Sequence, residues 1–297
     1  MLTKTSPSTG LGSPDVTGFY EPASGSIQYV VTCPTTRQAA LVDVVMGFDP
    51  DAARLDPAPT EAVCNYVEAE GLSVALILDT HPHADHLMAQ ALLKERYGAP
   101  TGIGAKVAEI AALWREIYHM PDAFEAMRDF DHLFEDGDTF RIGDLDGRVM
   151  LSPGHTLASV TYVIGDAAFV HDTVMQPDFG TARADFPGGD AATLYDSVAA
   201  ILALPDATRL FVGHDYGTEE RDEPCWESTV AEQKASNVHL VGCATKADFV
   251  ALREARDAGL GLPRRMLAAL QVNLCGGRLP HPEADGKRYL KIPLNRF

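Results

Sequence analysis

Cysteine is scarce in this sequence. Five cysteines are spread over 297 residues, and no two of them form a Cys-X-X-Cys pair. Disulfide frameworks and thiolate zinc sites both require paired or clustered cysteines. The distribution therefore argues against either one. The N-terminal residues 1–18 are polar and lack the apolar stretch of a signal peptide. We therefore expect a reduced, cytoplasmic compartment.

Long apolar runs and basic clusters are lacking as well. No run reaches the about 18 apolar residues that a membrane-spanning helix requires. Against 42 Asp and Glu there are only 24 Lys and Arg, which gives a formal net charge of −18. Such a charge repels a phosphate backbone, and the densest basic cluster is the pair Arg264 and Arg265. We expect neither a membrane span nor nucleic-acid binding.

The rest of the composition is that of a globular protein, with 46% hydrophobic and 22% charged residues. A chain of this length can bury a core without a structural metal, so a metal site would be catalytic. The expected strands are 26–31, 38–45, 72–78, 148–151, 159–164, 167–170 and 209–212, and the expected helices are 60–70, 85–97, 105–133 and 193–204. Strands in two groups with helices between them indicate an α/β or α+β protein with layered sheets.

Polar residues follow four of the apolar runs. The residues concerned are His81, His155, Asp172 and His214. A strand end fixes the position of such a side chain, and the loop that follows leaves room for a ligand. This placement predicts one site assembled from four separate parts of the chain.

The densest of these positions is the segment His81-Pro82-His83-Ala84-Asp85-His86. It holds three imidazoles and one carboxylate in six residues, although the whole chain has only ten histidines. Imidazole nitrogen and carboxylate oxygen are ligands that suit zinc, iron and manganese. Because the segment connects a predicted strand to a predicted helix, several of its side chains can face one cavity. A metal site is therefore favoured over a histidine-rich surface turn.

This HxHxDH pattern resembles that of the metallo-β-lactamase superfamily. The later elements of the superfamily pattern follow in order, namely Gly154-His155-Thr156, Asp172 and His214. The resemblance covers residues 25–220 approximately. It implies a four-layer αββα sandwich with the metal at one edge of the two sheets. We expect one domain over residues 1–297, with its core at about 25–220 and a C-terminal extension at about 221–297. A lone histidine or aspartate would more often be a structural residue, but the family order reverses that expectation.

Two later segments resemble one branch of the superfamily. The Arg183-Ala-Asp-Phe and His214-Asp-Tyr216 stretches are similar to the persulfide dioxygenases, and residues 270–293 resemble the C-terminus of longer bacterial members. The resemblance implies oxidation of glutathione persulfide by O2 to sulfite and glutathione. The implied substrate is a small thiol persulfide, and a homodimer is possible.

The same resemblance implies one Fe(II) per chain with two histidines and one aspartate as ligands. The implied ligands are His81, His155 and Asp172, the residues that hold the thiol carrier are Arg183 and Tyr216, and the surrounding polar residues are His83, Asp85, His86 and His214. A guanidinium suits the substrate-binding role because it can grip a carboxylate with two hydrogen bonds, and glutathione has two carboxylates.

Two alternatives remain open. A dinuclear zinc or iron hydrolase of a glutathione thioester, similar to glyoxalase II, would use every polar residue of the pattern. Its ligands would be His81, His83 and His155 for one metal, Asp85, His86 and His214 for the other, and Asp172 as the bridge. A metal-bound sensor without turnover is the second alternative, although the intact ligand set argues against it.

His171 departs from the pattern of both subfamilies, which usually carry glycine before the metal-binding aspartate. It could donate a hydrogen bond to a metal ligand or simply fill space.

Overall fold

The computed structural model describes residues 1–297. Its strands are β1 (Leu2–Ser6), β2 (Asp15–Glu21), β3 (Ser26–Thr32), β4 (Gln38–Val42), β5 (Val45–Asp49), β6 (Arg54–Asp56), β7 (Ser73–Leu78), β8 (Leu87–Met88), β9 (Thr101–Gly104), β10 (His132–Phe134), β11 (Thr139–Ile142), β12 (Leu145–Leu151), β13 (Val160–Ile164), β14 (Ala167–His171), β15 (Arg209–Val212) and β16 (Glu227–Thr229). Its helices are α1 (Ala58–Ala69), α2 (Gln90–Tyr97), α3 (Val107–Tyr118), α4 (Ala126–Asp129), α5 (Ala191–Leu202), α6 (Val230–Ser236), α7 (Lys246–Asp257) and α8 (Met266–Asn273).

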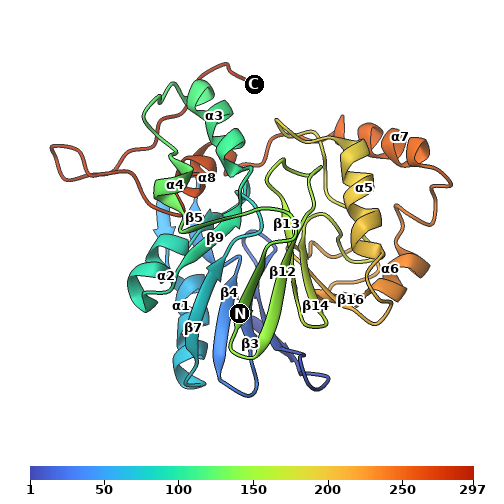
Figure 1. Ribbon diagram of the computed structural model, residues 1–297. Helices are drawn as coiled ribbons and strands as arrows, with labels where there is room; N and C mark the ends of the chain where they lie inside the picture. The colour runs from blue at the N-terminus through green and yellow to red at the C-terminus, as the bar shows by residue number, and fades with distance from the viewer.

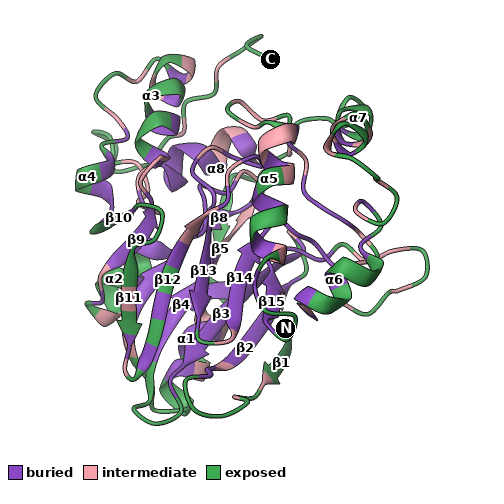
Figure 2. Cartoon of the chain, turned by 45° about the vertical axis from the view of Figure 1, so that its right-hand side comes forward, coloured by how far each residue is buried: buried purple, intermediate pink, exposed green.

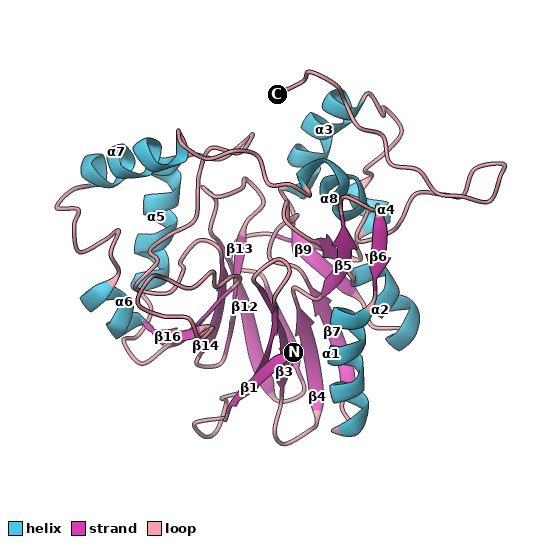
Figure 3. Cartoon of the chain, turned by 180° about the vertical axis from the view of Figure 1, so that it is seen from behind, coloured by secondary structure: helices cyan, strands magenta, loops and turns pink.

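Two main sheets form the centre of the molecule. One has the strand order β1-β2-β3-β4-β7-β9-β10, and the other has the order β11-β12-β13-β14-β15-β16. Figure 1 shows α1 and α2 on the outer side of the first sheet, beside β7, and α5 and α6 on the outer side of the second. The expected α/β class with layered sheets is confirmed, and Figure 3 shows the same layers from behind.

The core lies between the two sheets. Every residue of β3 is buried, because the second sheet covers one face of the strand and α1 packs on the other. Tyr29 of β3 meets Phe169 and Phe211 of the second sheet edge to face, with ring centroids 5.3 and 5.7 Å apart. Figure 2 shows the central strands, such as β3, β13 and β14, buried and the outer faces of the helices exposed. None of the helices is both long and apolar enough to cross a membrane.

Helix α5 illustrates how the outer layer forms. Asp190 caps it, because the Asp190 carboxylate accepts a hydrogen bond of 2.7 Å from the backbone N–H of Thr193. Leu194, Val198 and Ile201 recur at helical spacing and pack into the core cluster of the second sheet. The apolar face thus fixes the helix against the sheet.

Two expected helices and one expected strand differ from the structure, and strands form where none was expected. The strand expected at 38–45 is divided into β4, which ends at Val42, and β5, which begins at Val45. The helix expected at 85–97 begins only at Gln90, because Leu87 and Met88 pair with β5. The helical stretch expected at 105–133 is divided into α3 and α4, since His119 has a left-handed backbone (φ 49°) that ends α3. The polar N-terminus contributes β1 and β2 to the first sheet.

Strand direction determines where the polar residues meet. Strands β12, β14 and β15 run the same way, because β12 and β14 are both antiparallel to β13 and β14 is parallel to β15. The loops after these strands therefore open at one edge of the second sheet. In the first sheet β4 and β7 are parallel, so Asp43 and Asp79 follow neighbouring strand ends.

Candidate metal centre

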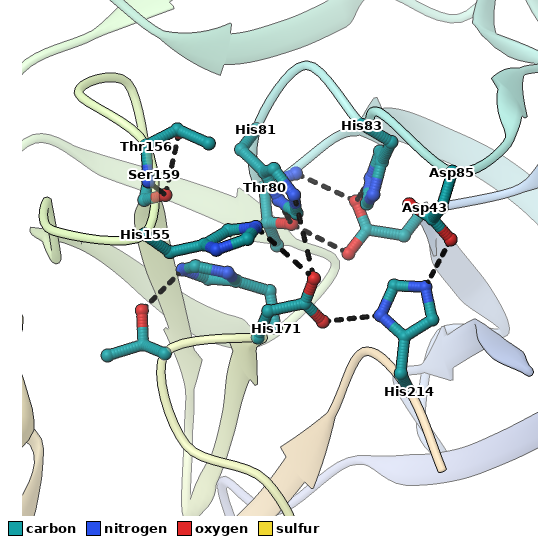
Figure 4. A network of polar contacts seen from close by, with 12 residues as sticks. Asp43, Thr80, His81, His83, Asp85, His155, Thr156, Ser159, His171 and His214 are labelled. Carbon is teal, nitrogen blue, oxygen red and sulfur yellow. Dashed lines mark hydrogen bonds and ion pairs between the residues drawn. The ribbon is translucent and has the colours of Figure 1, made fainter. Parts of the chain in front are cut away.

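Three side chains converge at this edge of the sandwich. His81 follows β7, His155 follows β12 and Asp172 follows β14, and their ligand atoms all lie within 4.8 Å of one another. The Asp172 Oδ2 atom is 3.8 Å from His81 Nε2 and 3.4 Å from His155 Nε2. Figure 4 shows both imidazoles pointing toward this carboxylate.

The hydrogen bond made by His155 Nδ1 determines which nitrogen of this imidazole carries the hydrogen. His155 Nδ1 lies 2.8 Å from the backbone carbonyl oxygen of Arg183. A carbonyl oxygen only accepts, so Nδ1 carries the hydrogen and Nε2 presents a bare lone pair. Burial also lowers the pKa of His155, although Asp172 opposes this effect.

A chain of hydrogen bonds gives His81 the same tautomer. The Thr80 hydroxyl donates to the carboxylate of Asp43 at 2.8 Å, so the hydroxyl oxygen accepts from His81 Nδ1–H at 3.1 Å. His81 Nε2 is then left bare. Burial, with the neighbouring histidines, lowers the pKa of His81 well below its ordinary value.

Two bare imidazole nitrogens and one carboxylate therefore face a common point with no hydrogen between them. Burial raises the pKa of Asp172, but His214 and His155 outweigh it and hold the pKa below its ordinary value. Three electron-pair donors cannot satisfy one another, whereas a cation satisfies all three. The His81, His155 and Asp172 set fits a divalent metal, and two histidines with one carboxylate form the facial triad that leaves positions open on iron.

A second group of ligand atoms lies next to the first. The metal loop, which we define as residues 79–86, also brings His83, Asp85 and His86 within 4.8 Å of one another. His83 Nε2 is 3.1 Å from the Asp43 carboxylate, and His83 Nδ1 has no partner. His86 Nδ1 faces the carbonyl oxygen of Leu87 at 3.2 Å, which leaves its Nε2 free. This second group therefore has ligand atoms that could hold another metal ion.

His214 lies between the two groups. Its Nδ1 is 2.5 Å from Asp172 Oδ1 and its Nε2 is 2.6 Å from Asp85 Oδ2. Carboxylates only accept, so both nitrogens donate. Burial lowers the pKa of His214, but Asp172 and Asp85 outweigh burial and hold it well above its ordinary value. While both contacts are made, neither nitrogen of His214 has a free lone pair.

His171 is buried beside the triad in a left-handed backbone conformation (φ 41°). Its ring centroid is 4.9 Å from that of His81, and Figure 4 shows it beneath His155. Its Nε2 is 2.8 Å from the hydroxyl of Thr173, not from a triad residue. The side chain therefore packs against the triad histidines and makes no hydrogen bond to them.

A cavity of about 290 Å³ opens over the metal centre. Asp85, His155 and Asp172 are among the residues that line it. Both residues expected to bind the thiol carrier, Arg183 and Tyr216, line it as well. The Tyr216 ring stacks on His214, with centroids 5.5 Å apart and an interplanar angle of 12°.

Arg183 is already strongly engaged. Its Nε and Nη2 atoms each lie 2.6 Å from a carboxylate oxygen of Asp185, and its Nη1 donates to the carbonyl oxygen of Gly261 at 2.8 Å. The guanidinium also lies over the Phe186 ring at 4.7 Å. These contacts fix its place in the cavity wall.

Two further arginines that no sequence motif marks also line this cavity. Arg253 and Arg256 come from α7 in the C-terminal part of the chain. Arg253 is buried and paired with Asp257 at 2.8 Å. Their spacing of three residues on one helix places them on the same face. This spacing is the feature of the sequence from which a shared position of the two arginines could have been predicted.

Arg256 has no carboxylate partner. Its Nη1 lies 2.5 Å from Nε2 of His239, whose Nδ1 accepts the backbone N–H of Thr181 at 2.9 Å. Burial, with Arg253 and Arg256, lowers the pKa of His239 to about 3, so the imidazole is neutral. The positive charge of Arg256 is thus left uncompensated beside the cavity.

Residues 24–214 match the family model described as the metallo-beta-lactamase superfamily. The chain belongs to this superfamily. It is 58% identical to the "Beta-lactamase hydrolase-like protein" of Xylella fastidiosa over 95% of this chain, but it spans only 65% of that protein's length. The division of this metallo-β-lactamase chain into a core and a C-terminal extension stays a prediction.

Two other similarities concern persulfide dioxygenases. The chain is 28% identical to "Persulfide dioxygenase ETHE1, mitochondrial" of Homo sapiens over 88% of this chain and 89% of the relative. Among solved structures, ETHE1 from Myxococcus xanthus superposes with a TM-score of 0.71 at 26% identity, covering 89% of this chain and 99% of that one. The metallo-β-lactamase fold is thereby confirmed.

Proposed function

We propose that this protein is an iron-dependent persulfide dioxygenase. The reaction is glutathione persulfide plus O2 and water giving glutathione and sulfite with two protons. Four electrons pass from the persulfide to the two oxygen atoms of O2, the bond between the two sulfur atoms breaks with its electron pair on the glutathione sulfur, and water supplies the third oxygen of sulfite. The observation that carries the proposal is the His81, His155 and Asp172 triad, in which two bare imidazole nitrogens and one carboxylate face a common point.

His81, His155 and Asp172 would hold Fe(II), which would supply the capacity for electron transfer between the persulfide sulfur and O2. The chain's own residues provide the orientation. Asp172 and Asp85 fix the His214 ring through both of its nitrogens. Met175 and Phe186 contribute apolar surface to the cavity wall, which restricts the access of water to the reacting sulfur.

The arginines of the cavity suit an anionic thiol carrier. Arg183, Arg253 and Arg256 line the wall, whereas only Asp185 and Asp257 neutralise them. A peptide-like thiol with carboxylates, such as glutathione, complements the positive charge of the arginine that has no carboxylate partner. Its thiol end would then point toward the triad at the inner end of the cavity.

We predict that Arg183→Ala weakens substrate use while iron occupancy stays unchanged. Loss of a bidentate carboxylate contact costs about 1.5–3 kcal/mol, and we expect the loss in kcat/KM for glutathione persulfide. Oxygen uptake at several persulfide concentrations measures it. Normal turnover by the variant would mean that Arg183 only pairs with Asp185.

We predict that Arg256→Gln raises KM for the persulfide about 10-fold or more, because the variant removes the guanidinium that has no carboxylate partner. Arg264→Gln is the matched control, since Arg264 is exposed and pairs with Asp51 outside this cavity. The same steady-state assay applies to both variants. An equal rise in KM in both variants would mean that the overall charge of the protein, and not Arg256 itself, determines the effect.

The second candidate is a dinuclear hydrolase of a glutathione thioester. The close approach of the ligand atoms of His83, Asp85 and His86 favours it. Two metal ions would clamp and activate water for hydrolysis. For His214 to serve as a ligand in this case, it would have to lose one of its two carboxylate contacts.

Metal analysis of anaerobically purified protein decides between the two reactions. One iron per chain, together with oxygen uptake on glutathione persulfide, supports the dioxygenase. Two metals per chain, together with cleavage of a glutathione thioester and no oxygen uptake, would reject it. Running both substrates on the same preparation keeps the comparison free of differences in metal loading.

A further inference from the structure

Asn273 is a fully buried residue at the end of α8, far in sequence from the metal centre. Its Nδ2 donates to the backbone carbonyl oxygens of His83 at 2.7 Å and His86 at 2.8 Å. Its Oδ1 accepts the backbone N–H of Met88 at 2.8 Å. One amide side chain thus bonds three backbone groups in and directly after the metal loop.

The partners fix the orientation of this amide. Two carbonyl oxygens require the NH2 group, and one N–H requires the oxygen, so a flipped amide would lose all three bonds. A buried backbone group without a partner is costly, and the Asn273 side chain is buried too deeply for water to replace it. The contact is therefore specific to an amide of this length.

The conformation of the metal loop depends on Asn273 because most of this loop has no other hydrogen bond to its backbone. From His81 to His86 the backbone makes no hydrogen bond to other backbone groups, and Asn273 is the one side chain that bonds it. At its start the loop is held differently, because Asp43 accepts the backbone N–H of Thr80 at 2.7 Å. Asn273 therefore holds the half of the loop that carries His83 and His86.

Packing keeps α8 in place for this role. Ala269 and Val272 of α8 form a buried apolar cluster with Leu87, directly after the metal loop. Gly277, in a left-handed conformation (φ 77°), lets the chain after α8 pass close to Met88, where a Cβ atom would lie 2.6 Å from the Met88 carbonyl oxygen. The helix that carries Asn273 is thus fixed on both sides of the contact.

We propose that Asn273 is a positioning residue for the metal centre. It holds the backbone of His83 and His86 so that the imidazoles of the metal loop point into the site before a metal arrives. The C-terminal part of the chain is then required for metal affinity, although it contributes no ligand. The proposal needs only metal binding. In the dinuclear site the contact orients two ligands directly, and in the mononuclear site it acts through the backbone of the loop that begins at the ligand His81.

The test compares Asn273→Asp with Gln271→Glu. Gln271 is the matched control, because it lies on the same helix, is buried, and also donates two hydrogen bonds and accepts one. Its partners are in α8 and the C-terminal segment, at Leu267 and Lys291. Co(II) affinity is measured by competition with a chelator, the Co(II) absorption spectrum reports ligand geometry, and thermal melting of metal-free protein reports stability.

We expect Asn273→Asp to weaken Co(II) binding by about 10- to 100-fold, the range seen for residues that orient metal ligands, and to change the Co(II) spectrum. Gln271→Glu lowers the melting temperature and leaves affinity and spectrum unchanged. Asn273→Ala serves as the second variant, because it introduces no charge and must show the same loss of affinity.

Three results would overturn the proposal. The first is wild-type Co(II) affinity and spectrum in a folded Asn273 variant. The second is an equal loss of affinity in Gln271→Glu, which would mean that both residues affect metal binding only through the overall stability of the protein. The third is failure of both Asn273 variants to fold while Gln271→Glu folds, which would make Asn273 a folding residue. Because no persulfide is used, failure of the dioxygenase proposal would leave this test unaffected.

Discussion

Replacing Asp172 with alanine is expected to abolish both metal binding and activity. Asp172 is the only anion in the triad, and its Oδ2 lies 3.8 Å from His81 Nε2 and 3.4 Å from His155 Nε2. Its Oδ1 also holds His214 at 2.5 Å. The variant leaves two neutral imidazoles and frees His214. The loss should exceed the about 100-fold typical of residues that only orient a ligand.

Elemental analysis of the purified variant, beside oxygen consumption, measures this effect. Asp178→Asn is a suitable control, because Asp178 pairs with Arg221 outside the triad. It removes one negative charge from the protein but leaves the triad intact. Full metal content in Asp172→Ala would rule out both the mononuclear and the dinuclear site.

Replacing Asp85 with alanine separates the two reactions. In the mononuclear site Asp85 touches no metal, and its Oδ2 accepts hydrogen bonds from His214 Nε2 at 2.6 Å and from the Ser26 hydroxyl at 3.5 Å. We then expect one iron per chain to remain and activity to fall by about 10- to 100-fold, as the ring of His214 loses one of its supports. In the dinuclear site Asp85 is a ligand, so the metal content halves and hydrolysis is lost.

Metal stoichiometry of wild type and variant, measured beside oxygen uptake and thioester cleavage, gives the answer. Ser24→Ala is a useful control, because Ser24 bonds Ser26, which in turn bonds His214 and Asp85, whereas Ser24 itself makes no hydrogen bond to Asp85. A fall from two metals to one with loss of thioester cleavage would contradict the dioxygenase proposal. A constant single iron would contradict the hydrolase.

Much of the fold is visible in the sequence because hydrophobic patterns are local. The apolar run at 72–78 is β7, and the hairpin around Gly165 is β13 and β14. Strand β1 was not predicted, since its residues are mostly exposed and its backbone pairing with β2 decides its conformation. The late start of α2 has a similar cause, because pairing of Leu87 and Met88 with β5 overrides the helical pattern.

The sequence by itself determined which ligand types are present and in what order. Three imidazoles and a carboxylate within residues 81–86 identify a metal-binding segment without any structure. Such a segment is recognisable because its ligands are close in the chain, and their chemistry belongs to the side chains alone. The later His155, Asp172 and His214 were found by their positions at strand ends.

Only the tertiary structure decided what each of these groups can do. The Arg183 carbonyl leaves His155 Nε2 bare, two carboxylates occupy His214, and Asn273 reaches the metal loop from α8. Arg256 joins the cavity by the packing of a helix that no motif marks. The physical reason is that a hydrogen bond depends on atoms about 3 Å apart and on their direction, and folding brings such atoms together regardless of their separation in sequence.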